Sequence, residues 1–309
     1  MELLTQVVLL VVGFGLLIKG ADFFVDGASG LATRFGIPQI VIGLTIVAFG
    51  TSAPEAAVSI TAAFKGNAGI TVGNVIGSNI FNILVILGIT ALIVPIRVKK
   101  NTIKFEIPYV VVMSVLLGAL GLFDGRVGLL DGIILWVCML VFMVYLLKLA
   151  KAGESEETSE GMSGSLWKLL FFMIGGLVVI IWGSDITVDS AVKIAELFGV
   201  DDRIIGLTIV AMGTSLPELV TSVTAAIKGN ADIAVGNIVG SNIFNILFVV
   251  GTAALITPVV YAGSFWADTI ICVLSAVLLW VCVAKKNLLG RAGGAVLLLC
   301  YAGYLIYLL

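Results

Sequence analysis

Long apolar runs, each about the length of a membrane span, follow one another along nearly the whole chain. A span needs about 20 apolar residues, or more when the helix is tilted. The one hydrophilic stretch of any length, residues 151–165, contains four glutamates. The pattern predicts an all-α integral membrane protein with ten transmembrane helices, at 4–26, 38–64, 70–94, 105–122, 127–149, 167–189, 203–227, 233–257, 265–284 and 290–308.

Two motifs occur twice, once in each half of the chain, at a constant offset of 163 residues. GTSAPE at 50–55 recurs as GTSLPE at 213–218, and GNVIGSNIFN at 73–82 recurs as GNIVGSNIFN at 236–245. The flanking sequence also repeats, which indicates a duplication. With five helices in each copy, the second copy enters the membrane in the opposite orientation.

The duplication predicts one transmembrane domain made of two inverted five-helix repeats. Residues 1–150 form the first repeat, 151–165 a linker and 166–309 the second repeat. The linker is interpreted as a solvated connection. A regulatory calcium site there is a weaker alternative, because the linker lacks the spaced ligands of an EF-hand loop.

The distribution of lysine and arginine predicts the orientation. If the N-terminus is outside the cell, thirteen of the seventeen basic residues fall on the cytoplasmic side. Cytoplasmic loops of membrane proteins carry an excess of Lys and Arg. We therefore expect a multi-pass protein of the cell membrane, with both termini extracellular and residues 151–165 cytoplasmic.

The repeated proline interrupts helices 2 and 7 beside a glutamate. Pro54 has no N–H and clashes with the carbonyl of Gly50, so the helix is predicted to break before Glu55. The carbonyls from Ala48 to Thr51 are expected to lose their helical partners, which is tolerated at membrane depth only where something else satisfies them. Pro217 repeats the arrangement beside Glu218.

The second motif places a hydroxyl and a carboxamide on one helix face, because Ser78 and Asn82 are four residues apart. Ser241 and Asn245 repeat this spacing. Together the two copies supply two carboxylates, two carboxamides, hydroxyls and carbonyls. An all-oxygen set suits hard cations such as calcium or sodium. One Ca²⁺ or two Na⁺ would neutralise both glutamates, which would otherwise be costly to bury.

Composition excludes other classes. The chain has no histidine, and its net charge of -2 gives no case for nucleic-acid binding. Its four cysteines form no CxxC pair, so they are interpreted as apolar helix residues. There is no G-x-S-x-G motif for a hydrolase. We expect a protein that is not an enzyme, that has no cofactor, and whose partners are ions and the lipid bilayer, acting as a monomer.

Other acidic residues are interpreted as peripheral. Asp22, Asp26, Asp185 and Asp189 are expected to be solvated or capping residues near the ends of helices 1 and 6. Lining an ion path is the alternative. Glu106 is expected to lie at the membrane interface.

On these motifs the chain resembles the prokaryotic sodium/calcium exchangers of the cation/calcium exchanger superfamily, whose repeats carry GTS-x-PE and GN-x-x-GSN. The resemblance covers essentially the whole chain. It implies an ion site between broken helices 2, 3, 7 and 8, with helices 1 and 6 sliding across them to alternate access. It implies that calcium and sodium share Glu55 and Glu218. The further ligands it implies are Ser52, Ser215, Ser78 and Ser241 for sodium, and mainly backbone oxygens at Thr51, Thr214, Ala48 and Ala211.

One departure from the family pattern concerns Asn245, where several prokaryotic relatives and the potassium-dependent branch carry aspartate. Asparagine here predicts that potassium is not co-transported. The short linker also lacks the large regulatory domain of animal exchangers. A proton/calcium antiporter of the same fold is the main alternative, and a passive cation channel a further one.

Overall fold

The computed structural model describes residues 2–65, 69–152, 164–198, 211–263 and 265–308, almost all of them helical. The first half contains α1 (Glu2–Phe35), α2 (Gln39–Ile42), η1 (Gly43–Val47), α3 (Ala48–Thr51), α4 (Ala53–Phe64), α5 (Gly69–Phe81), η2 (Asn82–Ile86), α6 (Leu87–Ile93), β1 (Ile96–Arg97), η3 (Thr102–Glu106), α7 (Ile107–Asp124), β2 (Arg126–Val127) and α8 (Leu129–Ala152). The second half contains α9 (Leu166–Leu197), α11 (Ala211–Gly213), α12 (Leu216–Ile227), α13 (Ala231–Phe244), η5 (Asn245–Val250), α14 (Gly251–Ile256), β3 (Val259–Val260), α15 (Phe265–Ala284), β4 (Leu288–Leu289) and α16 (Arg291–Leu308).

The all-α membrane fold is confirmed. Among the described residues, eight helices are long and apolar enough to cross a membrane, and a bent helix pair over 39–64 makes a ninth. The one remaining predicted span, helix 7 at 203–227, lies partly outside the described residues. Its described part consists of α11 and the apolar helix α12.

Predicted helix 2, which consists of α2, η1, α3 and α4, breaks at Ser52, as the sequence predicts. The segments Gln39–Thr51 and Ala53–Phe64 meet at an angle of 52°. Ser52 leaves helical geometry with φ −83° and ψ 8°, and α4 then begins at Ala53 with Pro54 in its first turn. Ser215 has nearly the same angles, φ −90° and ψ 5°, immediately before α12. Both breaks therefore have the same form, and each places a glutamate in the first turn of the helix that follows.

Predicted helix 3 consists of α5, η2 and α6, and predicted helix 8 of α13, η5 and α14. Each is a continuous span whose helical geometry is interrupted by one π-helical turn. The π turn begins at Asn82 in the first copy and at Asn245 in the second. Insertions of this kind shift the backbone hydrogen bonds by one residue and often occur at functional sites.

Helices 1 and 6 are longer than predicted, which corrects the interpretation of the aspartates. Helix α1 continues to Phe35 and α9 to Leu197, so Asp22, Asp26, Asp185 and Asp189 lie within the helices and do not cap them. The true end of α1 is a glycine cap. Gly36 has φ +62°, and the Ile37 N–H donates to the carbonyl of Ala32 at 2.9 Å.

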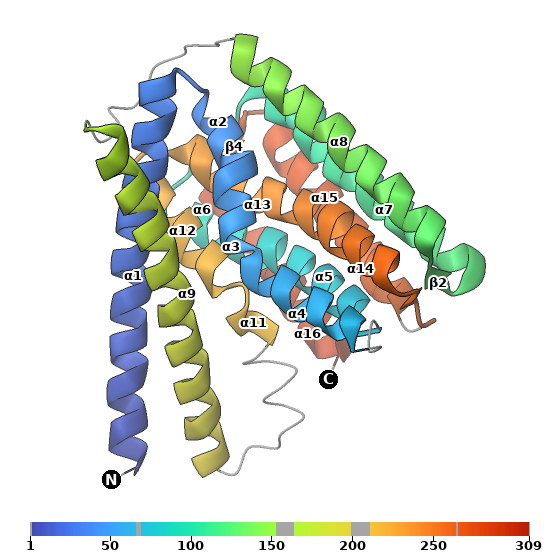
Figure 1. Ribbon diagram of the computed structural model, residues 1–309, viewed down its shortest axis with the longest axis horizontal. Helices are drawn as coiled ribbons and strands as arrows, with labels where there is room; N and C mark the ends of the chain where they lie inside the picture. The colour runs from blue at the N-terminus through green and yellow to red at the C-terminus, as the bar shows by residue number, and fades with distance from the viewer. Residues whose placement is uncertain (1, 66–68, 153–163, 199–210, 264, 309) are drawn as a thin grey trace.

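Helices α1 and α9 form an antiparallel pair beside the rest of the bundle (Figure 1). Glycines allow their backbones to touch. A Cβ on Gly20 would lie 2.8 Å from the main-chain nitrogen of Ile180, and one on Gly176 would lie 2.5 Å from that of Phe24. Small residues of this kind drive close packing of transmembrane helices.

The two halves run in opposite directions and interlock. Figure 1 shows the segment from α2 to α4 descending, while α11 and α12 ascend. Two short antiparallel ribbons each take one strand from either half, β1 with β4 and β2 with β3. These observations agree with the predicted inversion. The boundaries 1–150 and 166–309 remain predictions, and 153–163 of the linker lies outside the described residues.

Helices 3 and 8 form the centre of the bundle. In the apolar stretches of these two helices 78% and 94% of residues are buried, against 44% or less in the other six described helices that are long and apolar enough to cross a membrane. Gly236 contributes to this packing, since a Cβ there would lie 3.0 Å from the Cα of Gly43 in helix 2. Polar groups on helices 3 and 8 are consequently shielded from lipid.

Candidate functional site

The two motif glutamates are held by each other's repeat. The hydroxyl of Ser52 donates to Oε1 of Glu218 at 2.8 Å, and that of Ser215 donates to Oε1 of Glu55 at 3.1 Å. All four residues are completely buried. Each break therefore presents a hydroxyl to the carboxylate of the other break, which brings the two carboxylates to the interface of the repeats.

Helices 3 and 8 are joined by a symmetric set of four asparagines. The Nδ2 groups of Asn79 and Asn242 each donate to the main-chain carbonyl of the other residue at 3.2 Å. Asn82 donates from Nδ2 to Oδ1 of Asn242 at 3.0 Å, and Asn245 donates to Oδ1 of Asn79 at 3.2 Å. These bonds fix the direction of the Asn82 and Asn245 carboxamides, because each nitrogen is committed to the neighbouring helix.

A second pair of asparagines ties each of these helices to its own broken helix. Asn74 donates to Ser59 Oγ at 3.0 Å and to the carbonyl of Glu55 at 3.4 Å. Asn237 makes the equivalent bonds to Ser222 at 2.9 Å and to the carbonyl of Glu218 at 3.3 Å. The hydroxyl of Thr51 also donates to Asn237 Oδ1 at 2.9 Å, which crosses from one repeat to the other.

Sequence reasoning missed the supporting role of Asn74, Asn79, Asn237 and Asn242. The signal was present, since all four belong to the repeated GN-x-x-GSN motif. The spacing argument took only residues on the Ser78 and Asn82 face. It could not show that neighbouring asparagines reach across to another helix.

The remaining predicted residues lie at or beside the breaks. Ser78 and Ser241 are buried, and the Ser241 hydroxyl lies 3.5 Å from the carbonyl of Ala48. Thr214 is half-buried immediately before Ser215. Ala211 begins α11, and its side chain lies outside what the structure describes.

The prediction that Ala48 loses its helical partner is wrong. Its carbonyl accepts the N–H of Ser52 at 3.0 Å, as in an uninterrupted helix. The helix deviates only after this bond, at Ser52 itself. The same oxygen also accepts the hydroxyls of Thr51 at 3.4 Å and Ser241 at 3.5 Å.

Four buried oxygens at this interface have no hydrogen-bond donor within the described part of the chain. They are Oε2 of Glu55, Oε2 of Glu218, Oδ1 of Asn82 and Oδ1 of Asn245. They form two pairs related by the repeat offset of 163 residues. Leaving a buried polar atom unpaired is costly, so a symmetric set of four requires an explanation.

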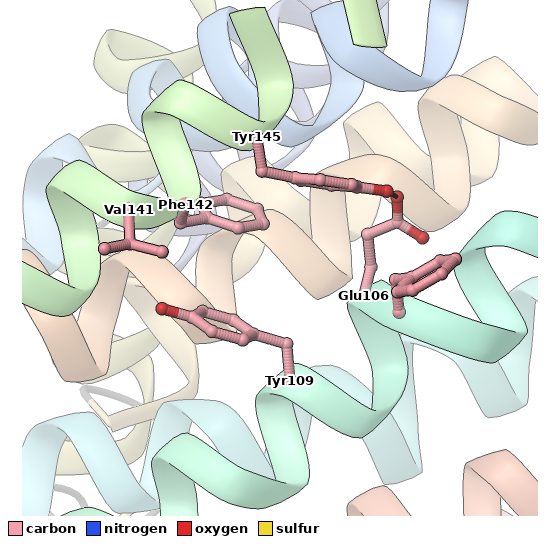
Figure 2. A pocket seen from close by; sticks show the side chains of 6 residues that line it. Glu106, Tyr109, Val141, Phe142 and Tyr145 are labelled. Carbon is pink, nitrogen blue, oxygen red and sulfur yellow. Dashed lines mark hydrogen bonds between the residues drawn. The ribbon is translucent and has the colours of Figure 1, made fainter. Parts of the chain in front are cut away.

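A third buried carboxyl, Glu106, lies apart from these residues. It was expected at the membrane interface, but only 1% of it is exposed. Tyr145 on α8 donates a hydrogen bond to it (Figure 2). It borders a cavity of about 200 Å³ between α7 and α8, which is otherwise lined by Phe105, Tyr109, Val141, Phe142 and Tyr145. Glu106 is the last residue of a π turn and its side chain is buried, which periodicity alone did not reveal.

Comparison with known proteins gives full-length matches. The chain is 42% identical to the "Putative antiporter CaxA" of Alkalimonas amylolytica, with 98% of each sequence covered. It is 31% identical to the "Sodium/calcium exchanger MaX1" of Methanosarcina acetivorans, with 97% of each covered. A structure of the sodium-calcium exchanger NCX_Mj, soaked with zero Na⁺ and Ca²⁺, superposes with a TM-score of 0.86 at 33% identity, covering 99% of this chain and 100% of that one.

Both halves also match one protein family. Residues 5–148 and 168–309 match the family described as "Sodium/calcium exchanger protein". The match covers both repeated motifs and leaves out the whole of the linker 151–165. The duplicated breaks, the inverted helices and the full-length likeness agree, and this chain belongs to the sodium/calcium exchanger family of membrane antiporters.

Proposed function

We propose that this protein exchanges sodium for calcium across the cell membrane, and that both ions use one site centred on Glu55 and Glu218. The observation that carries the proposal is the set of four buried, donor-free oxygens on the two glutamates and on Asn82 and Asn245. These are the residues that the sequence selects as ligands. A bound cation would give each of the four oxygens a favourable electrostatic partner in place of the missing hydrogen-bond donor.

The chemistry of the set fits calcium. Ca²⁺ takes about six to eight oxygen ligands and prefers carboxylates. The four donor-free oxygens would provide four of these ligands. The hydroxyls of Ser52, Ser215, Ser78 and Ser241 and backbone oxygens at Thr51, Thr214, Ala48 and Ala211 are the candidates for the remainder. One divalent ion balances the two buried carboxylates.

Sodium competes for the same oxygens. Two Na⁺ carry the charge of one Ca²⁺, so either occupation neutralises Glu55 and Glu218. Without a cation, two charged carboxylates would be buried together at a cost of several kcal/mol. An unoccupied site therefore resists reorientation through the membrane, and this couples the movement of one ion to the return of the other.

The α1–α9 pair is the element that we expect to move. It packs as one antiparallel unit beside the bundle that contains the site (Figure 1). Sliding such a unit past a fixed site would expose the site to either side in turn. Small side chains along the pair permit movement as a unit, because the two backbones are in direct contact.

The test is calcium uptake by purified protein in sodium-loaded liposomes diluted into sodium-free buffer, with membrane potential and pH gradient clamped. We expect uptake that collapses when sodium is equal on both sides. Uptake that follows an imposed proton gradient would replace sodium by protons as the coupling ion. Calcium flux that needs no opposing gradient would indicate a channel.

A further inference from the structure

The ends of the broken helices carry a repeated feature that the ion site does not use. Lys-Gly-Asn-Ala occurs at 65–68, after helix 2, and again at 228–231, after helix 7. The aspartates of helices 1 and 6 repeat at the same offset, Asp22 with Asp185 and Asp26 with Asp189. Each repeat therefore contributes one lysine and one pair of aspartates.

One of the two lysines holds helix 1. Lys228, at the end of α12, places Nζ 2.7 Å from Oδ1 of Asp26 and 3.4 Å from Oδ1 of Asp22. It also donates to the Asp22 main-chain carbonyl at 2.8 Å. The three side chains are only 24% to 35% exposed. The ammonium thus links α12 of the second repeat to α1 of the first.

The glycine after Lys228 fixes this geometry. Gly229 adopts φ +80°, and the Asn230 N–H donates to the carbonyl of Ala225 at 2.8 Å, which caps α12. Ala225 and Ala226 pack into the same apolar cluster as Ala21, Phe24 and Val25 of α1. At this end of the molecule, the helix pair is in contact with the bundle.

The other lysine makes no equivalent contact. Lys65, Asp185 and Asp189 are all exposed, and within the described residues no ion pair joins Lys65 to either aspartate. The two halves of the duplicated sequence therefore differ in conformation at this feature. In an inverted-repeat transporter, exchanging the conformations of the two halves produces the state that faces the opposite side.

We propose that Lys228 and Lys65 are alternating latches for the α1–α9 pair. In the state described here, Lys228 binds Asp22 and Asp26 and holds α1 against the end of α12. In the opposite state, Lys228 releases, and Lys65 binds Asp185 and Asp189 to hold α9 against the end of α4. This inference rests on the proposed alternating-access function, and it assigns positioning roles to the two lysines.

The latches set the balance between the two states. Removing the Lys228 latch shifts the balance one way, and removing the Lys65 latch shifts it the other way. A partly exposed ion pair is worth about a 1.5-fold to fivefold change in an equilibrium constant. Lys228→Gln should disfavour the state described here by about that factor, and Lys65→Gln should favour it. The double variant should return the ratio close to that of the wild type.

The test measures this ratio by distances between pairs of spin labels in full-length protein in nanodiscs, with the native cysteines replaced. Labels at Phe23 and Ile227 report on the Lys228 end. The equivalent positions, Ile186 and Phe64, report on the Lys65 end. Lys228→Gln should move the first distance distribution toward longer values and the second toward shorter ones. Lys65→Gln should do the reverse.

Lys19→Gln is the matched control. Lys19 also pairs with Asp22, at 3.6 Å, but within helix 1, and its side chain is 72% exposed. It has no lysine counterpart in the second repeat, so its removal should leave both distances unchanged. If Lys228→Gln fails to fold, the exchanged pair Lys228→Asp with Asp26→Lys should fold and restore the wild-type distribution.

Unchanged distances in Lys228→Gln, or shifts in the same direction for both single variants, would overturn the latches. Calcium uptake by the same proteins separates this failure from that of the proposed function. Sodium-driven uptake with unchanged distances removes only the latches. Reciprocal distance shifts without sodium-driven uptake in the wild type would support the latches and remove sodium as the coupling ion.

Discussion

At the scale of single residues, the site depends on where charge is allowed inside the membrane. Glu55 and Glu218 are completely buried, and each accepts one serine hydroxyl from the opposite repeat. The serines leave Oε2 of both glutamates without a donor in the described chain. The carboxylates are therefore oriented by the protein but left available to an ion.

Replacing either glutamate by glutamine tests this arrangement. Glu55→Gln or Glu218→Gln should reduce calcium uptake to the level of empty liposomes, because one remaining carboxylate cannot neutralise Ca²⁺. Glu106→Gln is the matched control, because it also removes a buried carboxyl, but one that bonds Tyr145 and borders the cavity between α7 and α8. Normal uptake by either site variant would remove both glutamates from the proposed site.

Asn245→Asp adds a third carboxylate beside the other two. The variant should still carry calcium, but its uptake should depend more steeply on pH. Below the pKa of the new carboxyl the side chain is neutral, like the amide, and above it the site gains one negative charge. The measurement is uptake across a pH series beside the wild type and Asn101→Asp, whose new carboxyl lies at the start of helix 4. A pH profile like that of the wild type would place Asn245 outside the site.

At the scale of elements, helix packing depends on glycines that the polar motifs do not contain. Gly20 and Gly176 bring α1 and α9 into backbone contact. Regular apolar periodicity predicts that both helices exist. It does not predict that they pack on each other, because leucines and valines face lipid as readily as they face a helix in a membrane.

Gly20→Ala should therefore weaken the α1–α9 pair. Its Cβ would lie 2.8 Å from the backbone of Ile180, so the helices must separate, at a cost of about 1–3 kcal/mol. The measurement is thermal unfolding in detergent. Gly15→Ala, on the same helix with no atom within 4 Å of its Cβ, should be neutral or slightly stabilising. Equal effects of the two substitutions would contradict the packing argument.

At the scale of the whole molecule, the two repeats are interdependent. Each supplies half of the proposed ion site, one strand of each ribbon and one helix of the α1–α9 pair. The interlocked halves already hold each other in register, so the linker is not needed to assemble the site. Most of that linker lies outside the described residues.

Deleting most of residues 154–162 should leave calcium uptake within about twofold of the wild type, if the segment only connects the repeats. A change of this size corresponds to less than 1 kcal/mol. The measurement is uptake by the deletion variant, after size-exclusion chromatography shows that it is folded and monodisperse. Loss of uptake in such a protein would indicate a regulatory role for the segment.

The sequence by itself determined the membrane class, the duplication, the proline breaks and the placement of Glu55 and Glu218 beside those breaks. These depend on local composition and spacing, because proline removes a specific backbone donor and an apolar run of membrane length has few other uses. Only the tertiary structure decided the serine–glutamate exchange across repeats, the asparagine links between helices 3 and 8, the burial of Glu106 and the pairing of Lys228 with Asp22 and Asp26. Each joins segments far apart in the chain, whose approach depends on how ten helices pack and not on any local pattern.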